Sequence, residues 1–343
     1  MPAPGAVIFG CEGLKLTEWE RGFFAKSDPL GFILFARNCE SPAQVKALVA
    51  ELRASVGRPD APILIDQEGG RVARLKPPHW RHCPPAGAFA AFMAVDKEAA
   101  AKAVYLNARL IAAELAGLGI TVDCAPLADI PVPGAHDIIG DRAYGLEPHQ
   151  VSTLARRMGQ GLIDGGVIPV LKHIPGHGRA TADSHESLPV VDADIETLRK
   201  TDFQPFKALK DLPWGMTAHI LYTALDKERV ATLSPTVIAL IREELGFDGL
   251  LLSDDISMKA LAGSFAERTK AVLDAGCDVV LHCNGKREEM EEIASAARPL
   301  TQAAESRVAR AEKMIADARK PENPALAAEF ETLWNALQSR LAA

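Results

Sequence analysis

The residues best suited to chemistry in this sequence lie in one short stretch that begins at Lys172. The stretch contains that lysine, three histidines (His173, His177 and His185) and one aspartate, Asp183. An imidazole can take up or release a proton near neutral pH, and a nearby carboxylate can fix its tautomer and raise its basicity. Asp183 and His185 therefore form a candidate acid/base pair in which the aspartate orients the histidine.

A second candidate is Asp254, which follows an apolar run at 249–252. A carboxylate at the end of a buried strand is held rigidly, as a nucleophile requires. A carboxylate nucleophile combined with a proton shuttle is the equipment of a retaining glycosidase. Asp255 could instead be the nucleophile, with Asp254 as a structural acceptor. Because side chains alternate along a strand, we expect only one of the two to face a pocket.

The same residues leave a metal site open as an alternative. The three histidines and Asp183 could bind a metal ion that Asp254 completes, as in metal-dependent hydrolases built on barrels. The positive charge of Lys172, next to His173, would repel such an ion. Loss of activity with EDTA would distinguish the metal site from the glycosidase.

Eight short apolar runs, each followed by a helical pattern, are expected to position these residues. They lie at 6–10, 31–36, 62–65, 120–126, 167–171, 214–219, 249–255 and 277–283. Apolar runs of this length are typical of parallel strands, and eight strand–helix units make a (β/α)₈ barrel. A doubly wound sheet is the main alternative, but it usually has fewer units and a glycine-rich phosphate loop after its first strand. We expect one α/β domain over residues 1–343, a TIM-type barrel with C-terminal helices at 300–343 packed outside it.

Capping signals mark where several helices begin. Thr17, Ser41 and Ser234 are expected N-caps, the last two followed by proline at the first helical position. The remaining patterns predict helices over 97–118, 148–164, 195–210 and 264–274. The Pro-rich segment at 77–85 is expected to be a loop.

Polar residues close six of the eight strands or begin the loops that follow. They are Asp66, Asp129, Lys172 with His173, His219, Asp254 and His282. In a barrel of this kind such positions meet at the C-terminal face, where active sites lie. We expect His177 to shape its loop by hydrogen bonding, Asp129 and His219 to be pocket wall at most, and Glu68 to bind sugar or to pair with Arg71 or Arg74.

Composition excludes several classes of protein. A net charge of −7 argues against a nucleic-acid or anionic-membrane partner. The six cysteines form no CxxC pair, the N-terminus lacks the pattern of a signal peptide, and no apolar run approaches the roughly 20 residues of a membrane span. We therefore expect a cytoplasmic, disulfide-free enzyme that works as a monomer on a small-molecule substrate.

Four segments together resemble one family. The segment 172–178 continued by 183–185, together with the segments 65–74, 140–144 and 253–258, is similar to the signature motifs of family 3 glycoside hydrolases of the NagZ type. These are β-N-acetylglucosaminidases of peptidoglycan recycling. The motifs occur in family order and span nearly the whole predicted barrel. The match departs from the family at Asp141, where a glutamate is common, although the carboxylate is kept.

The resemblance implies a role for each matching residue. Asp254 would be the nucleophile, His185 the general acid/base and Asp183 its partner. The residues implied to hold the sugar hydroxyls are Asp66, Arg74, Arg142, Lys172 and His173. The implied activity is that of a retaining exo-β-N-acetylglucosaminidase acting on 1,6-anhydromuropeptides, with no metal and no cofactor. A phosphorylase that uses phosphate in place of water stays open, as does a sugar-binding barrel without activity.

Overall fold

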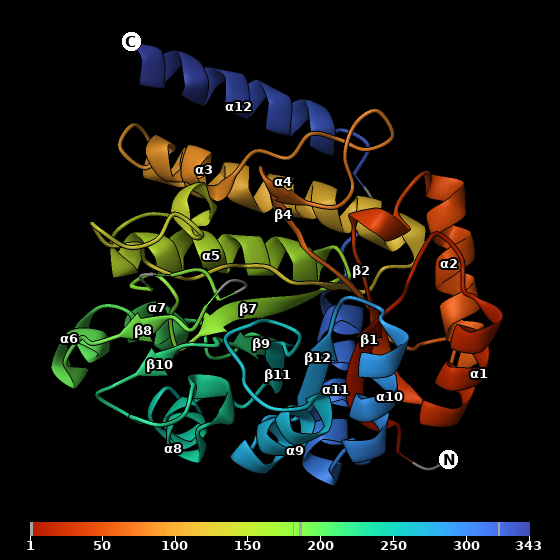
Figure 1. The fold of residues 1–343 in the computed structure, drawn as a ribbon. Coiled ribbons are helices and arrows are strands. Elements are labelled where there is room, and N and C mark those ends of the chain that lie inside the picture. Colours follow the sequence, from red (N-terminus) through yellow and green to blue (C-terminus); the bar gives the residue numbers. More distant parts are fainter. Residues whose placement is uncertain (1–2, 181, 185–186, 322) are drawn as a thin grey trace.

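The computed structural model describes residues 3–180, 182–184, 187–321 and 323–343, and it contains a closed barrel of eight parallel strands (Figure 1). The strands are β1 (Gly5–Gly10), β2 (Pro29–Leu34), β3 (Ile63–Ile65), β6 (Val122–Asp123), β7 (Ile168–Ile174), β9 (Trp214–Thr217), β11 (Leu250–Asp255) and β12 (Val279–His282). Each strand pairs with the next one in this order, and β12 pairs with β1 to close the ring. The predicted (β/α)₈ barrel is confirmed, and each of the eight predicted runs overlaps one of its strands.

Helices surround the barrel in the order expected of strand–helix units. They are α1 (Glu18–Ser27), α2 (Pro42–Ser55), α4 (Lys97–Leu118), α5 (Pro148–Asp164), α6 (Ile195–Lys200), α7 (Phe203–Ala208), α8 (Pro235–Ala239), α9 (Phe265–Ala275) and α10 (Arg287–Ala296). A π-helical turn, η4 (Leu240–Glu244), continues α8, and 3₁₀ turns lie at η1 (Ala36–Asn38), η2 (Gly140–Arg142) and η3 (Ala231–Leu233). Among the described residues, no helix combines the length and apolar character needed to cross a bilayer.

The predicted caps explain where helices begin. The Thr17 hydroxyl accepts from the Glu20 amide at 3.2 Å, and the Glu20 carboxylate accepts from the Thr17 amide at 2.8 Å. This reciprocal capping box satisfies two amides that the first turn of α1 leaves without helical partners. The Ser41 hydroxyl caps α2 by accepting from the Gln44 amide, with Pro42 at the first helical position.

One predicted helix is wrong in its length. The pattern over 195–210 predicts a single helix, but the structure contains two short helices, α6 and α7. Pro205 supplies the reason, because it has no amide to donate to the Thr201 carbonyl and its ring would clash there. The first helix therefore ends at Lys200, with Thr201 as its C-cap. Pro205 falls in the first turn of α7, where an amide has no helical partner to lose.

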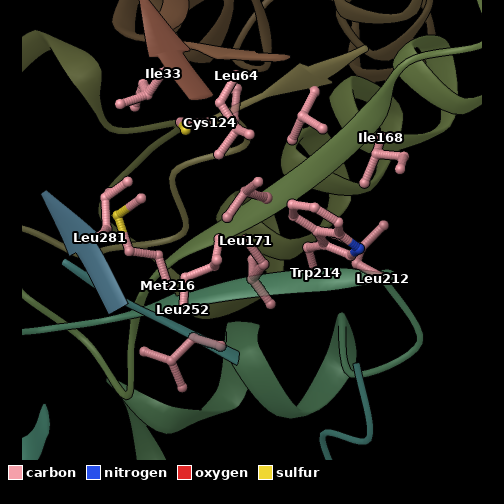
Figure 2. Packing of buried hydrophobic residues seen from close by; sticks show 14 of the residues in the cluster. Ile33, Leu64, Cys124, Ile168, Leu171, Leu212, Trp214, Met216, Leu252 and Leu281 are labelled. Carbon is pink, nitrogen blue, oxygen red and sulfur yellow. The ribbon is translucent and has the colours of Figure 1, made fainter. Parts of the chain in front are cut away.

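The core joins the strands to the helices around them. Figure 2 shows side chains from β2, β3, β7, β9, β11 and β12 in one cluster of buried residues, and Cys124, just after β6, belongs to the same cluster. Trp214, at the start of β9, is fully buried within it. Because apolar side chains fill the barrel, it is a packed core, and only its C-terminal rim can form a site.

Several elements do not belong to the eight strand–helix units. Helix α3 (Ala86–Phe92) lies between the Pro-rich loop and α4, in a segment for which no element was predicted. The last helices are α11 (Gln302–Ala318) and α12 (Leu326–Ala342), and α12 lies across α3 and α4 (Figure 1). Two small sheets, β4 (Gln67–Gly69) with β5 (Val72–Ala73) and β8 (Val190–Val191) with β10 (Leu221–Tyr222), follow the barrel strands β3, β7 and β9.

Candidate active site

A cavity of about 180 Å³ lies where the barrel strands end. Ile33, Met216 and Leu281, from β2, β9 and β12, contribute apolar lining. Six of the predicted site residues also line it: Asp66, Arg74, Arg142, Lys172, His173 and Asp254. They come from segments up to 188 positions apart in the chain, and closure of the barrel brings them together.

Four of these residues, with Glu68 behind them, form an alternating chain of charges, which we call the charged wall: Arg74, Asp66, Lys172, Glu68 and Arg142. Asp66 accepts from Arg74 at 2.9 Å and from Lys172 at 2.9 Å. The Lys172 ammonium also lies 2.6 Å from Glu68, which accepts two bonds from the Arg142 guanidinium, at 2.8 and 2.9 Å. Each charge is therefore balanced by its neighbour along a line that joins the loops after β3 and β6 to the end of β7.

The charged wall keeps its groups ionised although they are buried. Burial raises the pKa of Glu68, but Arg142 and Lys172 outweigh it and hold that pKa at about 2. Burial acts in the same direction on Asp66, and Lys172 and Arg74 hold its pKa below the usual range. Burial lowers the pKa of Lys172, whereas the two carboxylates raise it to a net value above normal. The wall therefore presents fixed ammonium, guanidinium and carboxylate groups, which suit a ligand rich in hydroxyls.

The prediction for Glu68 needs a correction. We expected it to bind sugar or to pair with Arg71 or Arg74, but its partners are Arg142 and Lys172. Arg71 lies at the rim and instead contacts Asp141, at 3.1 Å. Arg71 and Arg74 were predicted as partners because they are close to Glu68 in the chain. The actual partners belong to distant segments, η2 for Arg142 and β7 for Lys172.

Asp254 and Asp255 both line the cavity, so the expectation that only one would face it is wrong. The pairing of β11 with β12 shifts register between Leu252 and Asp255, which breaks the regular alternation of side chains. The Asp255 carboxylate accepts from the Ser257 amide at 3.0 Å and from its hydroxyl at 2.6 Å. Both Asp255 oxygens are thus engaged by Ser257. Asp254, one residue before the end of β11, accepts from the Asp255 amide at 2.8 Å and has 8% of its surface exposed.

His173 is held by a carboxylate below the cavity. Asp129 is fully buried and accepts from the His173 ring nitrogen Nδ1 at 2.8 Å and from the His177 amide at 2.6 Å. Burial raises the pKa of Asp129, but the two histidines hold it below its usual value. Asp129 therefore fixes the orientation of His173, although it is not among the residues that line the cavity.

His177 and His219 lie nearby in different roles. His177 lines the cavity, and burial, with the charge of His173, lowers its pKa to about 4, so its ring is neutral at pH 7. The His219 ring lies 2.8 Å from the Thr232 hydroxyl and 3.0 Å from the Asp255 carbonyl. His219 is thus a structural residue under Asp255.

Of the predicted acid/base pair, the structure describes Asp183, which lies on the loop after β7. Ser184 lines the cavity, and its carbonyl accepts from the Ala260 amide at 3.2 Å, which ties this loop to the one after β11. The Asp183 carbonyl accepts from the Ser187 amide at 3.0 Å. His185 lies outside the described residues. Among the described residues, no three His, Cys, Asp or Glu side chains are grouped as metal ligands would be.

Sequence reasoning missed Phe35 as a site residue. It lines the cavity just after β2, and the guanidinium of Arg74 lies 4.9 Å from its ring centroid. Its position at a strand end was available as a signal, but a phenylalanine in an apolar run is more often core. The contact with the Arg74 guanidinium distinguishes Phe35 from a core phenylalanine, and the sequence does not reveal that contact.

Comparison with known proteins agrees with this geometry. The family model described as glycosyl hydrolase family 3 N terminal domain matches residues 15–317. The chain belongs to glycosyl hydrolase family 3. The predicted resemblance is therefore confirmed, as is the enzyme class of glycoside hydrolase.

Individual relatives of this family 3 chain carry more specific names. A β-hexosaminidase of Methylococcus capsulatus is 40% identical over 282 residues, which cover 81% of this chain and 82% of the relative. NagZ from Neisseria gonorrhoeae, solved with N-trifluoroacetyl-D-glucosamine, has a TM-score of 0.85 at 28% identity and 99% coverage of both chains. A family 3 β-N-acetylglucosaminidase from a Paenibacillus species is 31% identical with a TM-score of 0.78, covering 98% of this chain and 61% of that one.

Proposed function

We propose that this protein is a retaining exo-β-N-acetylglucosaminidase that releases terminal N-acetylglucosamine from 1,6-anhydromuropeptides in peptidoglycan recycling. One observation carries the proposal: Asp254, near the end of β11, and four of the five residues of the charged wall line a single cavity. The names of the relatives support the N-acetylated sugar. The cavity, at about 180 Å³, is smaller than the roughly 300–1,000 Å³ of sites for drug-sized ligands. That size suits one terminal sugar and therefore an exo-acting enzyme.

In the first half of the proposed reaction, an Asp254 carboxylate oxygen attacks the anomeric carbon. The bond to the leaving oxygen breaks as protonated His185 donates its proton to it, which gives a glycosyl-enzyme and the free aglycone. Asp183 holds the imidazole in the right tautomer. In the second half, neutral His185 takes a proton from water, and the water oxygen displaces Asp254 from the same face, so the configuration is retained.

The charged wall would hold the sugar while these bonds change. The cations Lys172, Arg74 and Arg142 donate to hydroxyl oxygens, and Asp66 accepts from hydroxyl protons. His173, fixed by Asp129, adds a ring nitrogen to the same set. Because the wall is already ordered by its own ion pairs, the sugar would be oriented with little further loss of side-chain entropy.

Organisation and setting are part of the proposal. We propose that residues 1–343 act as one catalytic unit, monomeric and cytoplasmic, without a metal or other cofactor. The net charge of −7 supports a small soluble substrate rather than an anionic polymer or membrane. Light scattering of the purified protein and fractionation of the source cells would test the two physical claims.

The activity is tested with chromogenic β-N-acetylglucosaminide and β-glucoside, each with and without EDTA. We expect a strong preference for the N-acetylated sugar that EDTA does not change. Equal rates would overturn the N-acetylglucosaminidase assignment, and loss of activity with EDTA would favour a metal site. The same assay in phosphate buffer decides between hydrolase and phosphorylase, because a phosphorylase releases N-acetylglucosamine 1-phosphate.

A further inference from the structure

Helix α3 and the three residues before it pack against the two segments that carry a buried ion pair of the charged wall, Glu68 with Arg142. Glu68 lies on β4, just before a turn at Gly69–Gly70, and Arg142 is the last residue of η2. Neither segment belongs to a barrel strand. Their positions therefore depend on what packs against them from outside, and that is the segment 83–92, which we call the buttress.

The first contact of the buttress is with the turn that follows Glu68. The Gly70 amide donates to the Cys83 carbonyl at 2.8 Å. A Cβ atom added to Gly69 would lie 2.3 Å from the Pro84 carbonyl oxygen, and one added to Gly70 would lie 2.6 Å from Cβ of Pro85. The two backbones thus touch without room for a side chain, and the turn cannot move toward the buttress.

The second contact is with η2. A Cβ atom added to Gly87, in the first turn of α3, would lie 3.2 Å from the Asp141 carbonyl oxygen and 3.4 Å from its Cα. Asp141 directly precedes Arg142, so the separation of α3 from this backbone sets the height of the guanidinium above Glu68. At such distances an added methyl group must push its neighbour by a few tenths of an ångström.

Helix α12 holds the buttress from the other side. The Trp334 ring lies 5.1 Å from Phe89 and 5.0 Å from Phe92, centroid to centroid, in edge-to-face geometry with both. Aromatic pairs at this distance attract beyond their buried area. Figure 1 shows α12 lying over α3 on the side away from the barrel. The family match ends at residue 317, so α12 lies beyond it.

We propose that the buttress, clamped by Trp334, is a positioning element that sets the place of Glu68 and Arg142 and thereby the affinity for the sugar. A helix outside the barrel would thus control ground-state binding at the cavity. The inference rests on the proposed function, because it requires Arg142 to hold the substrate. Packing alone predicts something else: a loss of stability with an unchanged KM.

The test compares Gly87→Ala with Gly22→Ala, a control in helix α1 where an added Cβ meets nothing within 4 Å. For Gly87→Ala we expect KM for an aryl N-acetylglucosaminide to rise by about tenfold with kcat within about twofold, because a small displacement of a positioning group weakens binding. The control should match the wild type. An unchanged KM in Gly87→Ala would overturn the proposal.

A second pair of variants tests the clamp. Trp334→Ala should raise KM in the same way, and Trp334→Phe, which keeps an aromatic ring between Phe89 and Phe92, should restore most of the wild-type value. If Trp334→Ala fails to fold, Gly87→Ala still decides. A lowered melting temperature with an unchanged KM in Trp334→Ala would mean that α12 has only a packing role.

Hydrogen exchange without substrate separates this proposal from the proposed function. Backbone amides of 67–73 and 138–145 should exchange faster in Gly87→Ala and Trp334→Ala than in the wild type and in Gly22→Ala. If the wild type neither binds nor cleaves N-acetylglucosaminides, the proposed function fails. In that case hydrogen exchange alone tests whether the buttress positions the segments 67–73 and 138–145. Exchange rates in the two variants equal to those of the wild type would overturn this proposal.

Discussion

The two sides of the cavity hold their charged groups by different means. In the charged wall, Asp66 and Glu68 are paired with side chains that come from other loops and strands. At the end of β11, Asp254 accepts from the amide of the next residue at 2.8 Å, and Asp255 accepts from Ser257 two residues on. The positions of the charged-wall side chains therefore depend on contacts between distant segments. The carboxylates at the end of β11 are held in part by amides of their own segment.

This difference predicts different consequences of mutation. Removing one member of the wall leaves a buried partner charge uncompensated, so both stability and binding should fall. Removing Asp254 deletes the proposed nucleophile, so turnover should fall much more than stability. The predictions that follow test this contrast, from the largest expected effect to the smallest.

Asp254→Ala should lower kcat on an aryl β-N-acetylglucosaminide by about 10⁴-fold, the size of effect seen when a group of a catalytic set is removed. Its free energy of unfolding, from urea titration, should fall by less than that of Lys172→Met. Asp317→Asn, which changes an exposed carboxylate on α11, is the control. Near-normal turnover in Asp254→Ala would contradict the assigned nucleophile.

Lys172→Met should reduce the free energy of unfolding by about 3–5 kcal/mol, because Asp66 and Glu68 lose a shared buried cation. Urea titration at pH 7 measures it. Lys313→Met is the matched control, since its ion pair with Asp317 is exposed and worth about 0.3–0.5 kcal/mol. Equal losses in the two variants would mean that the wall does not depend on the charge of Lys172.

Glu68→Gln should weaken binding with little change in kcat. It removes charge-assisted hydrogen bonds from Arg142 and Lys172, each worth roughly 1.5–3 kcal/mol. We therefore expect KM to rise by about ten- to a hundredfold, measured with the same chromogenic substrate. Glu288→Gln on the exposed face of α10 should leave KM unchanged. A fall in kcat alone would place Glu68 in the chemical step instead.

Asp123→Asn should change how stability depends on pH. Burial raises the pKa of this carboxyl to about 7, and one of its oxygens has no hydrogen-bond partner among the described residues. Because the folded pKa lies above the unfolded value, the stability contributed below about pH 4 is lost as the pH rises toward 7. Asparagine cannot ionise, so its advantage over the wild type should grow across that range. The free energy of unfolding of both proteins is measured by urea titration at pH 4 and at pH 7. The same difference between variant and wild type at the two pH values would contradict the raised pKa.

The fold was largely predictable because its signals are local. Short apolar runs and capping residues such as Thr17 and Ser41 report on their own neighbourhoods, and these predictions were confirmed. The break between α6 and α7 also has a local cause, because Pro205 interrupts an otherwise helical pattern. Helix α3 was missed because Pro84 and Pro85 precede it and because its partners, Asp141 and Trp334, are distant in the chain.

Six of the residues predicted for the site line one cavity, whereas few of their contacts could be predicted from the sequence. The sequence by itself determined which groups stand at strand ends, because the side chain that follows an apolar run is fixed in position by the strand before it. Only the tertiary structure decided that Glu68 pairs with Arg142 and Lys172, that Asp129 orients His173, and that Asp254 and Asp255 share one cavity. These contacts depend on strand register and on the loops that meet at the C-terminal end of the barrel. The free energy of a buried charge depends on its partner, and the sequence alone does not identify that partner.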